Sequence, residues 1–324
     1  MEELHEPVWE GDGRNWEAGA GTALRLARAE ARLLRRRPAA PPDAVIVGYP
    51  GHLDLPAARR AARGAPVVLN PLVSLADTLV VDRGRFRPGS LPARALRAVD
   101  RFALRGADLV VADTETHADH LAQLAGLPRE RVAVCLVGAE ERLFSPPWHP
   151  REPVLFVGKL IPLHGLETIL AAARLLPDVP IRVVGSGQLD ALLTRRPANV
   201  EWVPWIPYER LGAVLRAARA ALGVFGSSPK AARVIPNKVF QALACGTPVV
   251  TAATPAAREL LEDGCSALLV PPGDAEALAE ALQRLASDGE LGRRVGEQGH
   301  AVYRERASEE VLGRRWRGLL EQLL

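Results

Sequence analysis

Short apolar runs alternate with longer amphipathic stretches along almost the whole chain. In the second half, the apolar runs occupy residues 154–158, 181–185, 200–203, 221–225, 248–251 and 267–270. In the first half, they occupy residues 44–48, 66–70, 108–113 and 131–137, and helical patterns at 21–36, 90–105 and 115–125 accompany them. Runs this short and apolar predict buried strands, and their alternation with helices predicts α/β domains built on parallel sheets.

A proline-rich stretch between the two series predicts a domain boundary. Residues 144–153, FSPPWHPREP, contain four prolines. We therefore expect a first domain over residues 1–147 and a second over residues 152–307, each doubly wound and Rossmann-like. The last segment, 308–324, has a helical pattern and no strand after it. Two such domains form a cleft between them, and ligands bind at the carboxyl ends of the strands where the strand order reverses.

Composition narrows the class of protein. The 324 residues are 48% hydrophobic and 24% charged, which is typical of a globular chain of about two domains. The net charge of +3 is too small to indicate a nucleic-acid partner. The three cysteines lack metal-ligand spacing. Because no apolar run reaches the roughly 18 residues that span a bilayer, and the N-terminus has no signal-peptide core, we expect a soluble cytoplasmic protein.

A basic amphipathic stretch near the N-terminus has two interpretations. In residues 22–38, TALRLARAEARLLRRRP, arginines lie opposite leucines at helical spacing. Such a helix is usually a solvated surface helix. The alternative is peripheral contact with anionic lipid at the inner face of the membrane. The arginines concerned are Arg25, Arg28, Arg32, Arg35, Arg36 and Arg37.

The beginning of the chain lacks the unit that normally opens a doubly wound domain. Such a domain begins with a buried strand, a glycine-rich turn and a helix. Residues 1–9, MEELHEPVW, alternate like a strand, and a loop-like stretch follows them. We expect a strand here, but not the usual opening unit.

The stretch 233–251, RVIPNKVFQALACGTPVVT, combines charge with the start of a short helix. Pro236 suits the first turn, whose free N–H groups attract an anion. Lys238 and Arg233 add positive charge, and Gln241 can bind a sugar hydroxyl. The alternative is an ordinary capped and solvated helix start, but the convergence of several cations favours a ligand site. The candidates are Lys230, Arg233, Pro236, Asn237, Lys238 and Gln241.

A second candidate region lies where the strand at 154–158 ends. Gly158 lets a ligand approach the backbone, and Lys159 leaves the carboxyl end of the strand. His164 and Gly165 lead into the next helix, so that Lys159 and His164 can both face a diphosphate. Gly187 permits an anion-binding turn. Ordinary loops carry the same residue types, so the pattern is equally compatible with a plain turn.

An aromatic cluster follows the strand at 200–203. Trp202, Trp205 and Tyr208 surround two prolines in EWVPWIPYERL. The backbone from Val203 to Ile206 can grip a flat base. For the side chains, packing in the core or under a lid is the favoured interpretation.

The first domain offers fewer candidates. His52 follows a predicted strand and can act on an acceptor hydroxyl in the cleft, although a lone histidine is more often structural. Further polar residues at later strand ends have no assigned role, and they are Asp77, Asp82, Arg83 and Asp113.

These motifs together resemble the GT-B fold glycosyltransferases, specifically the large retaining family 4. The resemblance rests on VLFVGKLIPLHGLETILAAARLL, NVEWVPWIPYERL, PNKVFQALACGTPVVT and RVAVCLVGAEERLFSP, and it is strongest over residues 150–290. It implies that the second domain binds a nucleotide-sugar donor and the first binds the acceptor. It also implies that the helix at 308–324 crosses back onto the first domain, and that Lys159 contacts the donor diphosphate.

The chain departs from the family pattern in three places. His164 stands where the family usually has a lysine, and Arg233 and Gln241 stand where it commonly has two glutamates. Lys230, Arg233 and Lys238 are expected to compensate around the phosphates. The missing opening unit leads us to expect that the natural product carries about 20–30 further residues, the length of one βα unit.

The resemblance implies sugar transfer from a nucleoside-diphosphate sugar to an acceptor hydroxyl, with retention of anomeric configuration. Lys159 and His52 are the expected catalytic residues. No Asp-x-Asp metal motif is apparent, so we expect no metal and no cofactor beyond the donor substrate. The acceptor is a glycan, a lipid-linked glycan or a small molecule. The alternatives are a nucleotide-sugar-binding partner with weakened catalysis and a GT-B nucleotide-sugar epimerase.

Overall fold

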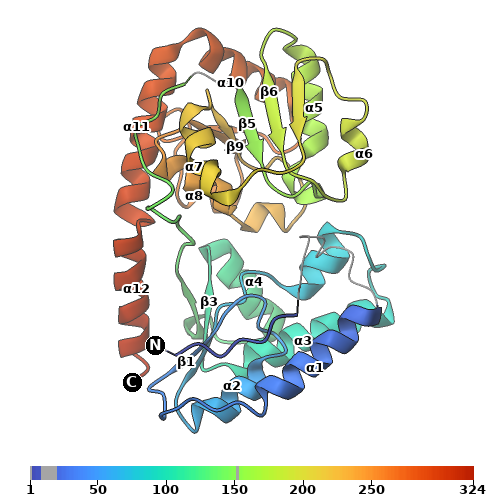
Figure 1. The fold of residues 1–324 in the computed structure, drawn as a ribbon, viewed down its shortest axis with the longest axis vertical. Helices are drawn as coiled ribbons and strands as arrows, with labels where there is room; N and C mark the ends of the chain where they lie inside the picture. The colour runs from blue at the N-terminus through green and yellow to red at the C-terminus, as the bar shows by residue number, and fades with distance from the viewer. Residues whose placement is uncertain (1, 9–19, 151–152) are drawn as a thin grey trace.

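Two parallel β-sheets, each covered by helices, divide the protein into two domains that stack along its long axis (Figure 1). The computed structural model describes residues 2–8, 20–150 and 153–324, with the backbone alone for residues 20–23. The strands follow the predicted apolar runs closely. The α/β class expected from the sequence is therefore confirmed.

The first sheet has the order β1-β2-β3-β4 within the described residues, and all its strands are parallel. Its strands are β1 (Val45–Val47), β2 (Val67–Leu69), β3 (Leu109–Ala112) and β4 (Val132–Val134). Its helices are α1 (Ala20–Leu33), α2 (Leu55–Ala62), α3 (Leu91–Gly106) and α4 (Glu115–Ala125), with a π-helix η1 (Asp77–Asp82) and a 3₁₀ turn η2 (Arg129–Arg131). Every residue of β2 and β3 is buried, because central strands of a parallel sheet are covered on both faces.

The second sheet has the order β10-β9-β8-β5-β6-β7. Its strands are β5 (Val154–Val157), β6 (Ile181–Val184), β7 (Val200–Val203), β8 (Ala221–Leu222), β9 (Val249–Ala252) and β10 (Leu268–Val270). Strand β5 pairs with both β6 and β8, so the order reverses there. The carboxyl end of β5 is therefore the place where a ligand is expected in a doubly wound sheet.

Helices cover both faces of the second sheet. They are α5 (Leu166–Leu175), α6 (Asp190–Leu193), α7 (Tyr208–Ala217), α8 (Asn237–Ala244), α9 (Pro255–Arg258), α10 (Ala275–Ser287) and α11 (Gly289–Arg306), with 3₁₀ turns η3 (Pro162–His164) and η4 (Ala231–Arg233). Asp274 caps α10, because its Oδ1 accepts a hydrogen bond of 2.9 Å from the Ala277 N–H. Turns η3 and η4 both follow strand ends near the reversal, and they carry candidate site residues.

The last helix, α12 (Glu309–Glu321), returns to the first domain. In Figure 1, α11 and α12 run down one side of the molecule and span both domains. Leu319 of α12 is buried against Leu109 and Val111 of β3, and Trp316 packs on the same cluster. Residues 308–324 thus cover the face of the first sheet opposite to α2 and α4.

Leu319→Ala should lower the free energy of unfolding by about 2–4 kcal/mol, because it opens a cavity in this cluster. Leu324→Ala is the matched control. Leu324 is 72% exposed, whereas Leu319 is 5% exposed, so the control should change stability by less than about 0.5 kcal/mol. Urea unfolding followed by circular dichroism measures both. Equal effects would mean that α12 does not contribute to the core of the first domain.

The expected strand at the N-terminus does not form. Residues 2–8 are neither helix nor strand, and Met1 and Trp9 lie outside the described residues. The segment is held by polar contacts instead: the Glu6 carboxylate lies 2.5 Å from the Arg36 guanidinium and 3.7 Å from that of Arg32. Alternation of side chains predicts a strand only where a neighbouring strand can pair with it.

Helix α1 exposes most of the side chains described for it. Leu24 is 54% exposed, and Leu34, directly after the helix, is 39% exposed. Ala29 is buried against the domain. Across the ranges that the structure describes, no helix combines the length and apolar character that crossing a membrane requires.

Candidate active site

The carboxyl end of β5 brings three predicted site residues into contact. Gly158 has a φ of +147°. A Cβ atom at Gly158 would lie 2.8 Å from the Lys238 Nζ and 3.3 Å from the His164 Cε1. The positive φ favours glycine here, and a Cβ would also displace the tip of the Lys238 side chain. Gly158, Lys238 and His164 therefore form one small cluster at the strand reversal.

Lys238 is buried at the start of α8 and points into the domain. It is 9% exposed, and its Nζ lies 3.7 Å from the centroid of the Phe156 ring. Within the residues that the structure describes, this Nζ has no hydrogen-bond partner. Burial lowers the pKa of Lys238 well below its usual value. Burying an amine without an anion beside it costs free energy, and a negatively charged ligand would supply the missing opposite charge.

His164 is held in one orientation beside this amine. Its Nδ1 lies 2.5 Å from the Lys159 carbonyl oxygen, and its ring meets Phe156 edge to face. Burial, followed by the positive charge of Lys238, lowers the pKa of His164 well below its usual value. The imidazole is therefore neutral at pH 7, with Nδ1 donating. Gly165, the N-cap of α5, has a φ of +67° and packs against the Phe225 backbone.

Lys159 is the exposed cation of the site. No salt bridge or side-chain hydrogen bond engages its amine among the described residues. Partial desolvation and the neighbouring Arg83 guanidinium lower the pKa of Lys159. The chain has 38 arginines and three lysines, which are Lys159, Lys230 and Lys238. All three lysines lie at or near the strand ends that face the first domain.

Lys230 and Arg233 contact carboxylates of the first domain. The Lys230 amine donates a 2.9 Å hydrogen bond to the Thr78 hydroxyl and lies 3.9 Å from Asp82. The Arg233 guanidinium lies 2.6 Å from Asp77. Asp77, Thr78 and Asp82 all belong to η1, so this π-helix contacts the second domain directly.

The two carboxylates of η1 differ in their pKa. Burial acts to raise the pKa of Asp77, but His120, 2.9 Å away, and Arg233 outweigh it and hold the pKa below its usual value. For Asp82, burial prevails over the attraction of Lys230, and the pKa is raised. Ionisation is therefore favoured for Asp77, the partner of Arg233 in the second domain, and disfavoured for Asp82 beside Lys230.

A second set of hydrogen bonds joins the domains at α4. The Glu259 carboxylate accepts from the N–H groups of Glu115 and Thr116 at 2.6 and 2.8 Å, at the N-terminus of α4. The Thr114 hydroxyl donates to the Arg233 carbonyl at 2.7 Å. A carboxylate at a helix N-terminus is favourable because it binds free N–H groups and the positive end of the dipole.

The remaining predicted donor-site residues already make polar contacts within the protein. Gln241 is half-buried, and its side chain lies near the Tyr208 hydroxyl, where it acts to lower the pKa of that group against the larger effect of burial. The Gly187 N–H donates to the Asp190 carboxylate at 2.6 Å. Val203 accepts from the Gly185 N–H at 2.9 Å.

Other predicted residues lie at the surface or pack beside these contacts. Asn237 is exposed, and Pro236 is the N-cap of α8 rather than its first helical residue. Ile206 packs against the second-domain core. Packing was the favoured interpretation for the tryptophans, and it is right for Trp202, whose indole N–H donates to Gly185, but wrong for Trp205, which is 74% exposed.

His52 lies inside the first domain. It is 2% exposed, and its Nε2 is 3.3 Å from the Asp100 carboxylate. Burial lowers the pKa of His52, although Asp100 opposes this. Asp100 also accepts hydrogen bonds from the Ser74 hydroxyl and the N–H groups of Leu75 and Ala76. The pair therefore supports the residues before η1, and His52 offers almost no surface to a substrate.

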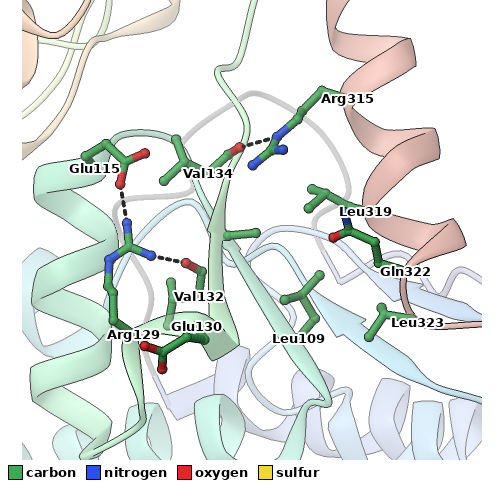
Figure 2. A pocket seen from close by; sticks show the side chains of 11 residues that line it. Leu109, Glu115, Arg129, Glu130, Val132, Val134, Arg315, Leu319, Gln322 and Leu323 are labelled. Atoms are coloured by element: carbon green, nitrogen blue, oxygen red, sulfur yellow. Dashed lines mark hydrogen bonds and ion pairs between the residues drawn. The ribbon is translucent and has the colours of Figure 1, made fainter.

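One surface pocket lies away from this cluster, between β4, α4 and α12 (Figure 2). It has a volume of about 490 Å³. In Figure 2, the Arg315 guanidinium donates to the Val134 carbonyl and Arg129 to the Val132 carbonyl. These arginines cap the outward carbonyls of an edge strand, which protects that edge from pairing with another chain.

The two facing domains, the strand reversal at β5 and the return of α12 define the GT-B architecture. Sucrose-phosphate synthase from Thermosynechococcus elongatus has this fold, with a TM-score of 0.73 and 20% identity over 94% of this chain and 78% of that chain. Anabaena HepE in complex with UDP-glucose has a TM-score of 0.69 and 19% identity, over 92% and 82% of the two chains.

The family follows from the sequence matches. Residues 151–288 match the family described as Glycosyl transferases group 1, and residues 4–138 match the Glycosyl transferase 4-like domain. The second domain therefore matches the group 1 glycosyltransferases, and the first domain matches the glycosyltransferase 4-like domain.

Curated relatives agree with this family. D-inositol 3-phosphate glycosyltransferase of Mycobacterium sp. (strain KMS) is 30% identical over 72% of this chain and 57% of the relative. Lipopolysaccharide core biosynthesis glycosyltransferase LpsE of Rhizobium meliloti is 26% identical over 80% and 77%. The chain spans a little over half the length of the mycobacterial relative.

The structure adds residues that sequence reasoning left without a role. Asp77 and Asp82 face the cations of the second domain, and His120 and Glu259 complete these contacts. Asp77 and Asp82 follow a predicted strand in ADTLVVD, which marks them as candidates but assigns them no role. No local signal identified Glu259, because its partners lie about 140 residues away along the chain.

Proposed function

We propose that the protein transfers a hexosyl group from a nucleoside-diphosphate sugar to an acceptor hydroxyl, with retention of anomeric configuration. The observation that carries this proposal is the unpartnered amine of Lys238 beside Gly158 and His164, at the strand reversal of the second domain. A diphosphate supplies the negative charge that this amine lacks. Lys159 adds a second cation from the solvent side.

The reaction needs the charge on the departing diphosphate to be neutralised. Lys238 and Lys159 are positioned to do so with the chain's own cations, and we propose that no metal ion is required. The neutral His164 keeps its Nε2 as an acceptor and adds no charge. Closure of the cleft excludes water, which favours transfer over hydrolysis of the donor.

Known relatives suggest the first donor and acceptor to test. HepE has been crystallised with UDP and with UDP-glucose, so UDP-sugars are the first candidate donors. The curated relatives act on D-inositol 3-phosphate or in lipopolysaccharide core biosynthesis. We propose a role in polysaccharide, cell-envelope or glycoconjugate biosynthesis, with a glycan, lipid-linked or small-molecule acceptor and no nucleic-acid partner.

Incubation with a panel of UDP-, GDP-, ADP- and dTDP-sugars, with and without EDTA, tests the proposal. Slow donor hydrolysis that survives EDTA supports a metal-independent transferase. An interconverted sugar would instead identify an epimerase. Retention is tested by NMR of the anomeric proton of the transfer product, once an acceptor is found.

A second candidate function is a nucleotide-sugar-binding partner with weakened catalysis. It is favoured by Arg233 and Gln241, which stand at the family's acidic positions and are engaged by Asp77 and Tyr208. Binding of a donor without any turnover would support it. Gln241→Glu then asks whether restoring one acid restores turnover.

Donor binding should be accompanied by proton uptake. The pKa of Lys238 is lowered well below 10.5 in the free protein, and a bound diphosphate raises it. The complex therefore holds more protons than the free protein, so UDP affinity should fall as pH rises between these two pKa values. Calorimetry at several pH values below 10.5, in buffers of different ionisation enthalpy, measures the uptake. An absence of uptake would place the diphosphate elsewhere.

We also propose that the protein is cytoplasmic and makes peripheral contact with anionic membranes through α1. Exposed Arg28 and Arg35 lie near the exposed Leu24 and Leu34 along this segment. Co-sedimentation with phosphatidylglycerol vesicles, but not with pure phosphatidylcholine vesicles, would support this. Equal recovery with both would contradict it.

A further inference from the structure

Arg83 is carried by the first domain to the edge of the β5 site. It follows η1 directly, and its carbonyl accepts a 3.4 Å hydrogen bond from the Gln188 side chain of the second domain. The loop of Gln188 is fixed to the end of β5, because the Leu160 N–H donates to Ser186 and the Leu189 N–H donates to Leu160. Arg83 therefore lies beside the segment that carries Lys159.

On its other side, Arg83 adjoins the contact between Asp82 and Lys230. Asp82 precedes it in sequence and lies 3.9 Å from the Lys230 amine. Arg83 is thus set between two second-domain cations, although it belongs to the first domain. Its positive charge lowers the pKa of both Lys159 and Lys230, in each case after the effect of desolvation.

No carboxylate forms an ion pair with Arg83 in the described part of the chain. Its Nε is buried and has no hydrogen-bond partner there. Arg233 and Lys230, which lie close by, are each within ion-pair distance of a carboxylate of η1, whereas Asp82 acts on Arg83 through its charge without forming an ion pair. Crowding like charges around a buried, unpaired guanidinium N–H costs free energy. A bound dianion between these cations removes that cost.

We propose that Arg83 is a donor-site residue, the contribution of the first domain to binding the diphosphate together with Lys159. This inference rests on the proposed function. A guanidinium suits the role because its fixed fork of N–H groups matches phosphate oxygens. Because Arg83 and Lys159 come from different domains, a diphosphate held by both favours the closed cleft. Donor binding and closure of the two domains are then thermodynamically coupled.

The test compares Arg83→Ala with Arg87→Ala, an exposed arginine of the same loop for which the structure gives no side-chain contact. UDP, GDP, ADP and dTDP are titrated into the wild-type protein by calorimetry, and the nucleotide that binds best is used for the variants. Arg83→Ala should weaken its affinity at least 10-fold, and Arg87→Ala should change it less than 2-fold. Arg83→Lys, which keeps the charge without the fork, should lie between them. Thermal unfolding checks that the variants are folded.

The outcomes separate this inference from the function on which it rests. Nucleotide binding by the wild type that Arg83→Ala leaves unchanged would overturn the role of Arg83 while the proposed function stands. A loss of nucleotide affinity of similar size in Arg87→Ala would also overturn the role of Arg83. The effect would then come from the general positive charge of the surface. A wild-type protein that binds none of the four nucleotides would overturn the proposed function itself.

Discussion

Lys238→Met is expected to unfold at a higher urea concentration than the wild-type protein and to lose about 100-fold in donor turnover. The gain in stability, about 1–3 kcal/mol, comes from removing a buried amine that has no hydrogen-bond partner among the described residues. Methionine has a similar length and helix propensity, and its sulfur can contact the Phe156 ring on which the amine now lies. The loss of turnover comes from removing a cation from the leaving diphosphate.

Opposite changes in stability and activity are the distinguishing result. Replacement of a purely structural lysine would lower both stability and donor turnover. Replacement of a surface lysine would change neither. Arg210→Met is the control, because Arg210 is an exposed cation of α7 with no side-chain contact given by the structure. It should leave both quantities within error. A destabilised Lys238→Met would show that the contact of the amine with the Phe156 ring outweighs the cost of burying it. Unchanged turnover would remove Lys238 from the site.

The fold could be predicted because its determinants are local. The strands of a parallel sheet are apolar on both faces, so runs such as 66–70 and 181–185 mark β2 and β6 without knowledge of their neighbours. The stretch at residues 1–9 has a strand-like alternation and no strand to pair with. Its Glu6 instead binds arginines of the α1 region, which local periodicity does not report.

The site could be predicted only as a neighbourhood. The strand-end rule located Gly158, His164 and Lys238 in the same region, and they do meet there. Their burial was not foreseen, because it depends on how α8 packs over Phe156. The engagement of Arg233 by Asp77 was not foreseen either, since these residues are 156 positions apart and belong to different domains. Charge alone does not distinguish a cation that awaits a ligand from one that already has a carboxylate.

Lys159→Ala is expected to leave stability unchanged and to lower donor turnover about 100-fold. Its side chain is exposed and unengaged in the described residues, so truncation removes no packing. Its backbone carbonyl, which accepts from His164, is kept in the variant. Lys159→Arg retains the charge and should recover part of the activity. A large change in the urea midpoint would mean instead that Lys159 holds the β5 loop together.

Selective acylation of Lys159 provides a second measurement that does not depend on knowing the acceptor. The chain has three lysines. Lys230 and Lys238 are 8% and 9% exposed, whereas Lys159 is exposed and its pKa is lowered, so more of its amine is unprotonated and reactive at pH 7.5. An N-hydroxysuccinimide ester should therefore modify Lys159 first among the lysines, as mass spectrometry of peptides can show. Bound UDP should protect it, because a diphosphate both covers the amine and raises its pKa. Labelling of Lys159 at the same rate with and without a bound nucleotide would place the diphosphate away from the end of β5, even if Lys159→Ala were inactive.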